Sequence, residues 1–173
     1  MRQITLRGYI DDYLADDLSH WLAFYNGSQE PVVLEIHSPG GSVIAGLRMI
    51  DAINSQPFPM HCKVNGIAAS MAAIIAMNCK SVSMTPNSHL MFHELSTIAF
   101  GKYSEIKTEL EFMDSLMDKL TGIMQKRFKQ SNEELKTWLE KDRYITAEKA
   151  LEMGIIDSIE GQTEALTKEE DMN

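Results

Sequence analysis

A serine, a histidine and an aspartate give this chain the residue types of a nucleophilic hydrolase. Ser70 lies between a strand-like segment at 60–64 and a helix-like segment at 71–77. The free N–H groups at the start of such a helix favour developing negative charge, which helps a nucleophilic serine if a base is available. His93 is the candidate base, and Asp142 is the candidate group that orients the histidine.

Each of these residues also has a plain structural interpretation. A serine before an apolar helical run is usually only an N-cap. A histidine at a strand end is more often a hydrogen-bonded polar residue than a base. Asp142 stands between Lys141 and Arg143, where an exposed ion pair is the ordinary arrangement. The segment around Ser70 is not the Gly-x-Ser-x-Gly turn of α/β-hydrolases, because alanines occupy both glycine positions.

A second motif, Ser-Pro-Gly-Gly-Ser at 38–42, separates a predicted strand from a predicted helix. Its paired glycines allow unusual backbone angles and a close approach to a ligand. The motif can therefore be a simple turn or a source of N–H groups for an oxyanion. A phosphate-binding loop is disfavoured, because the chain has neither a Walker ending here nor a Gly-x-Gly-x-x-Gly pattern.

The composition predicts a single globular domain that binds neither nucleic acid nor membranes and resides in the cytoplasm. The 173 residues carry a net charge of −9, so a basic nucleic-acid footprint is absent. The apolar runs are shorter than the roughly 20 residues that cross a bilayer, and residues 1–10 do not resemble a secretory signal. Cys62 and Cys79 predict free buried thiols in a reducing compartment. The five histidines lack metal-ligand spacing, so we expect neither metal nor other cofactor.

Strand-like and helix-like segments alternate along the chain, which favours an α/β fold with a largely parallel sheet. Asp11 or Asp12 can cap the first helix, Ser131 with Glu134 forms a capping box, and Thr146 caps the last helix. The expected strands lie at about 3–6, 32–36, 60–64, 80–84, 90–92 and 155–159. The expected helices lie at about 12–24, 43–53, 71–77, 103–129, after 131, and 148–153.

The predicted helix at 103–129 is long for a domain of this size, at roughly 40 Å. Its apolar residues recur every three or four positions and form one stripe: Ile106, Leu110, Met113, Leu116, Met117, Leu120, Ile123 and Met124. We expect the helix to project from the body and to bury this stripe against another subunit. The alternative is a helix that packs only within its own domain. The domain is expected to span 1–160, and the polar, acidic composition predicts a loose tail at 161–173.

Four motifs, in the same order, resemble the ClpP family, the serine peptidase subunit of the Clp protease. They are Ser-Pro-Gly-Gly-Ser at 38–42, Gly-x-Ala-Ala-Ser-Met at 66–71, Pro-Asn-Ser-x-x-Met-x-His at 86–93 and Asp-Arg-Tyr-x-x-Ala-x-x-Ala-x-x-x-Gly-x-Ile-Asp at 142–157. The resemblance covers roughly residues 2–160. It implies a ClpP/crotonase-like α/β core of repeated β-β-α/α-β units, from which the long handle helix projects.

The resemblance also implies a role for each site residue. Ser70 is the nucleophile, His93 the general base and then acid, and Asp142 the group that orients the imidazole. The N–H groups of Gly41 and Met71 form the oxyanion hole. The family further implies a ring-shaped homo-oligomer, two stacked heptamers joined through the handle helix, whose chamber admits unfolded or extended polypeptides.

Two departures from the family pattern concern partners and substrate binding. The chain begins almost at the first predicted strand, which puts in question the docking of an AAA+ unfoldase, the only expected consumer of ATP. After His93, the family's Gln-Pro and Gly-rich strand is replaced by residues 94–101, which contain no proline and one glycine. The short form also resembles phage-encoded ClpP-like proteases that process capsid or scaffold proteins.

A serine endopeptidase that acts through an acyl-enzyme is the favoured function. The alternatives are a catalytically silent ring or scaffold subunit of the same fold, a phage capsid-maturation protease, and an acyl-CoA enzyme of the related crotonase fold. Met71, Ile67, Ile98 and Phe100 are the expected neighbours of the substrate side chain before the scissile bond. Their apolar character predicts a preference for apolar or bulky residues at that position.

Overall fold

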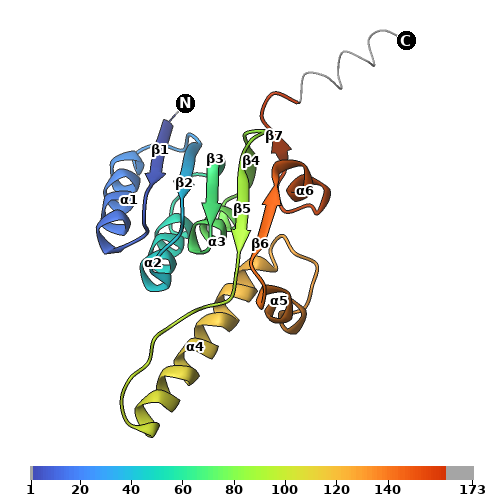
Figure 1. The fold of residues 1–173 in the computed structure, drawn as a ribbon. Coiled ribbons are helices and arrows are strands. Elements are labelled where there is room, and N and C mark those ends of the chain that lie inside the picture. Colours follow the sequence, from blue (N-terminus) through green and yellow to red (C-terminus); the bar gives the residue numbers. More distant parts are fainter. Residues whose placement is uncertain (1, 163–173) are drawn as a thin grey trace.

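The computed structural model describes residues 2–162, which form one seven-stranded sheet with helices packed around it (Figure 1). Position 1 and positions 163–173 lie outside the described residues, and most of the predicted tail lies there. The predicted α/β fold with a largely parallel sheet is confirmed.

The sheet is organised around its third strand. The strands are β1 (Arg2–Arg7), β2 (Val32–Ser38), β3 (Met60–Ala69), β4 (Ser81–Met84), β5 (His89–Phe92), β6 (Arg143–Thr146) and β7 (Ser158–Ile159). They follow the order β1-β2-β3-β4-β7, while β5 pairs with β3 and β6. The first half of β3 pairs with β4 and its last three residues pair with β5, all in parallel; only the β5–β6 pair is antiparallel. Strand β3 therefore bridges the two parts of the sheet and ends in the residue before Ser70.

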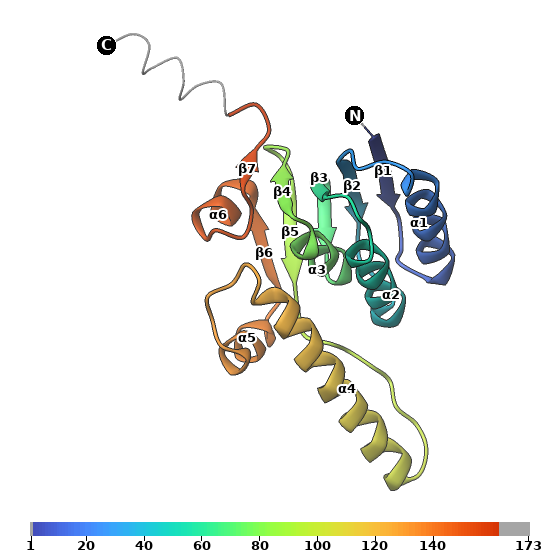
Figure 2. The same ribbon diagram turned by 180° about the vertical axis from the view of Figure 1, so that it is seen from behind.

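The first three helices pack side by side against one face of the sheet (Figures 1 and 2). The helices are α1 (Asp12–Tyr25), α2 (Val43–Asn54), α3 (Met71–Asn78), α4 (Tyr103–Met124), α5 (Asn132–Leu139) and α6 (Ala147–Glu152). All eight residues of α3 are buried, which matches its apolar composition on every side. Helix α3 is therefore the centre of the core, and it begins directly after Ser70.

The predicted caps and thiols are found where the sequence indicates them. Asp11 Oδ1 accepts a hydrogen bond from Leu14 N at 2.8 Å, and Ser131 with Glu134 forms the capping box of α5. Thr146 caps α6. Both cysteines are free and buried, and burial raises the pKa of the Cys62 thiol.

Four elements differ from the prediction. Strand β3 continues to Ala69, so only Ser70 separates it from α3. Strand β6 was not predicted, and the last strand covers two residues rather than five. Helix α4 ends at Met124, not at 129, and Arg127, beyond its end, turns back toward the core. Its guanidinium donates to the carbonyl oxygens of Met77 and Cys79 at the end of α3.

Helix α4 projects from the domain, and only its second half packs against it (Figures 1 and 2). Leu116, Leu120 and Met124 are buried within the protomer. Leu110 and Phe112, nearer the tip, are 53% and 48% exposed. The apolar stripe predicted from sequence is thus divided: its inner part is buried within the protomer, whereas in its outer part Ile106 and Met113 are half-buried and Leu110 is exposed.

Candidate active site

Ser70 and His93 lie together because each follows one of two adjacent parallel strands. Ser70 comes directly after β3 and His93 directly after β5, and Ala69 is in register with Met91. Since parallel strands end at the same edge of a sheet, the pairing places both side chains at that edge. The bond from Ser70 N to Met91 O, 2.7 Å long, fixes the junction further.

The backbone of Ser70 has a conformation that serine rarely adopts. Its φ is 53° and its ψ is −126°, and it is the one non-glycine residue with positive φ between residues 2 and 162. Such a conformation costs about 1–3 kcal/mol and is concentrated at functional sites. The turn thus resembles a nucleophile elbow in its backbone, although the Gly-x-Ser-x-Gly sequence is absent.

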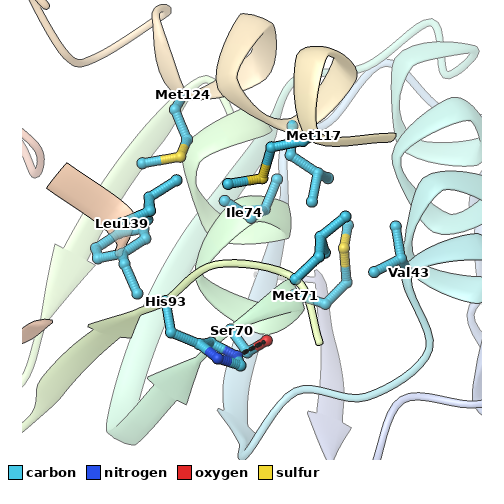
Figure 3. Close-up of a pocket in the computed structure, with 11 residues that line it drawn as sticks. Val43, Ser70, Met71, Ile74, His93, Met117, Met124 and Leu139 are labelled. Carbon is cyan, nitrogen blue, oxygen red and sulfur yellow. Dashed lines mark hydrogen bonds between the residues drawn. The ribbon is translucent and has the colours of Figure 1, made fainter. Parts of the chain in front are cut away.

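The Ser70 hydroxyl points to His93 and does not cap the helix behind it (Figure 3). Ser70 Oγ and His93 Nε2 are 2.7 Å apart. With the ring proton on Nδ1, the hydroxyl donates to Nε2, which is the arrangement in which histidine can take the proton. The N-cap interpretation of Ser70 therefore does not hold.

Asp142 lies at the same edge, but its carboxylate is not joined to His93. It immediately precedes β6, whose first residue Arg143 is in register with Phe92. Asp142 is exposed, and within residues 2–162 the structure gives no hydrogen bond between it and the histidine. The turn that carries Asp142 is held instead through Glu94 N, which donates to Leu139 O at 2.9 Å.

The glycine loop at 38–42 packs directly against the serine. A Cβ placed on Gly40 would lie 2.8 Å from Ser70 Cβ and 3.2 Å from Met71 N, so only glycine permits this approach. The loop is fixed on its other side by bonds from Ile10 N to Gly40 O and from Ser42 N to Ile10 O.

The N–H groups of Gly41 and Met71 are both without an acceptor among the described residues. Met71 is the first residue of α3, so its N–H also lies at the positive end of a helix dipole. N–H groups without an acceptor are the kind of donor that can stabilise an oxyanion.

An apolar cleft adjoins the serine and histidine (Figure 3). It is lined by Val43, Ser70, Met71, Ile74, Phe92, His93, Leu95, Met117, Leu120, Met124 and Leu139. Of the four neighbours expected from sequence, only Met71 lines it. Ile98 and Phe100 are 81% and 88% exposed and do not reach it, and Ile67 does not line it either.

Sequence reasoning missed the contribution of α4 and α5 to this cleft. The signal was present in the stripe of 103–129, because Met117, Leu120 and Met124 belong to it. The stripe was predicted to pack against another subunit, whereas the inner part of the stripe forms a wall of the cleft.

Two further observations concern metal ions and membranes. Over residues 2–162, no three His, Cys, Asp or Glu side chains are grouped so that they could hold a metal ion. Among the same residues, no helix combines the length and the apolar character that a membrane crossing needs.

Comparison with protein-family models identifies the family of the chain. A family model described as Clp protease matches residues 1–163, which is nearly the whole chain. The chain therefore belongs to the Clp protease family, a family of ClpP-type serine peptidases.

Proposed function

We propose that the protein is a serine endopeptidase with Ser70 as nucleophile and His93 as its base. The observation that carries this proposal is the 2.7 Å contact between Ser70 Oγ and His93 Nε2 at a strained strand-to-helix junction. A serine that served only to cap α3 would need neither the positive φ nor a histidine partner.

The reaction follows from the positions of these groups. Ser70 Oγ attacks the carbonyl carbon of the scissile peptide bond while His93 Nε2 takes the hydroxyl proton. The negative charge that develops on the carbonyl oxygen is stabilised by the N–H groups of Gly41 and Met71. His93 then protonates the leaving amine, which departs and leaves an acyl-enzyme on Ser70. A water molecule, deprotonated by His93, releases the acid and restores the serine.

In this mechanism Asp142 orients the imidazole and stabilises its cation. It can do so if the exposed carboxylate approaches His93 Nδ1, and the pairing of β6 with β5 keeps it close to that position. Catalytic hydrogen bonds of unliganded enzymes are often formed only in the substrate complex.

We also propose that the active form is a ring-shaped homo-oligomer of two stacked heptamers. Clp proteases are generally oligomeric, and the exposed Leu110 and Phe112 on the projecting half of α4 support a contact between rings. Enclosure of the active sites would restrict substrates to unfolded or extended polypeptides.

The decisive experiment is to treat the purified protein with a fluorophosphonate probe and to assay cleavage of short fluorogenic peptides and of casein. Wild-type protein should be labelled at Ser70 and should cleave both. Ser70→Ala should lose labelling and cleavage while its far-UV spectrum and its mass in solution stay unchanged. Wild-type protein that is neither labelled nor active would favour a silent ring subunit, and activity of Ser70→Ala would refute the assigned nucleophile.

A further inference from the structure

Gly46 occupies an interior position of α2, where glycine is less favourable than alanine. It is buried, and its helical backbone does not require the left-handed angles for which glycine is usually selected. Its presence there must therefore have another cause, such as the close approach of a neighbouring side chain.

That neighbour is Met71, the first residue after the nucleophile. A Cβ placed on Gly46 would lie 2.2 Å from Met71 Cγ, 2.7 Å from its Cε and 2.9 Å from its Sδ. Three atoms of one side chain thus occupy the space that any residue larger than glycine would need. Met71 is itself buried, and it also lines the apolar cleft beside Ser70 (Figure 3).

We infer that Gly46 is a positioning residue: it lets Met71 fold back against α2 and so sets the size of the apolar cleft. The size of the cleft in turn determines which substrate side chain is accepted before the scissile bond. This inference rests on the proposed peptidase function, and it assigns the cleft to that substrate side chain. Gly46 acts only through Met71, because it does not itself line the cleft.

The direction in which Met71 would move follows from the packing around it. On α2, Ala45 and Met49 are both buried, so the part of the helix around Gly46 is already packed. The open volume next to Met71 is the cleft, so a methyl group at position 46 should push the Met71 side chain into it. The Met71 N–H should keep its place, since the first turn of α3 is held by bonds from Ala73 N and Ile74 N to Ser70 O.

The test compares Gly46→Ala with wild type on fluorogenic peptides that carry Ala, Leu or Phe before the scissile bond. For the Leu and Phe peptides, kcat/KM should fall at least about tenfold, mainly through KM, because a change of one methylene in an apolar site changes selectivity by about that much. For the Ala peptide it should stay within about threefold. The double variant Gly46→Ala/Met71→Ala should restore kcat/KM for the Leu and Phe peptides, since the Met71 atoms that would collide with the new methyl group are gone.

Gly122→Ala is the matched control. It places the same substitution in α4 at a position where a Cβ would meet nothing within 4 Å, so the ratio of rates for Phe and Ala peptides should not change. Met71→Ala alone should raise that ratio, and it tests the inference even if Gly46→Ala does not fold.

Three outcomes would overturn the inference: an unchanged ratio in Gly46→Ala, an equal loss for all three peptides, or no recovery in the double variant. In each of these the wild-type enzyme is still active, so the proposed function survives. Wild-type protein that cleaves no peptide and is not labelled by the fluorophosphonate probe would instead refute both the inference about Gly46 and the proposed function.

Discussion

Replacement of Arg127 by methionine should destabilise the protein strongly, although the residue lies outside the candidate site. Its guanidinium side chain is 10% exposed and donates to four backbone carbonyl oxygens, those of Met77, Cys79, Lys80 and Ile155, at 3.1–3.3 Å. Two of these oxygens belong to the last turn of α3 and to its C-cap, where carbonyls lack intrahelical partners.

The size of the effect can be worked out from these contacts. Hydrogen bonds to a charged donor contribute about 1.5–3 kcal/mol each, but water that enters after the substitution will satisfy part of the released carbonyls. The ion pair with Asp157 adds little, because that carboxylate is half exposed and also accepts from Val82 N. We therefore expect Arg127→Met to lower the free energy of unfolding by about 3–5 kcal/mol, which is less than the sum for four such hydrogen bonds because water replaces part of them.

Urea unfolding followed by circular dichroism at several protein concentrations measures this change and separates it from assembly. Arg48→Met is the matched control. Arg48 makes two ion pairs of 2.7 Å with Asp12 and Asp16, but its side chain is 48% exposed, so its loss should change the stability far less than the loss of Arg127. A loss below about 1 kcal/mol for Arg127→Met, or an equal loss for both variants, would refute the argument that burial decides the value of these contacts.

Three further predictions concern the site, the assembly and helix α5. Asp142→Asn should lower kcat by orders of magnitude in steady-state assays; a negligible change would assign the orienting role to another group. Leu110→Glu should reduce the mass in analytical ultracentrifugation while the far-UV spectrum is retained, whereas Leu120→Glu should unfold the protomer, since Leu120 is buried within it. The bond from Ser131 N lowers the pKa of Glu134, so its stabilisation of α5 should be complete above the ordinary value of 4.5 and disappear as pH falls through the lowered value. Acid unfolding of Glu134→Gln, which has no carboxyl group to titrate at this position, should therefore show a smaller decrease in stability over that interval than wild type.

The features that sequence predicted well depend on local chemistry. The caps at Asp11 and Ser131 need only a side chain and the backbone three residues ahead, and both are found in the structure. The junction at Ser70 was visible because strand-like and helix-like patterns meet there. Periodicity could not predict the pairing of β3 with β5, which brings Ser70 and His93 together, since residues 69 and 91 meet only through the tertiary fold.

The features that were missed depend on partners distant in the chain. Strand β6 has four residues, and its extended conformation is fixed by pairing with β5, more than 50 positions earlier. The wall of the cleft comes from the inner half of α4 and from Leu139 of α5. A helix that covers its own domain and a helix that covers another subunit have the same stripe pattern. Helix α4 covers its own domain along its inner half only.

The strained torsion of Ser70 has a consequence for how this chain has evolved. Folding alone would favour glycine at position 70, because glycine adopts a φ of 53° at little cost. A Ser70→Gly protein should therefore be at least as stable as wild type while it lacks the proposed nucleophile, so the demands of stability and of the proposed chemistry oppose each other at this position. A chain that no longer needed the hydroxyl would gain stability by exchanging this serine for glycine.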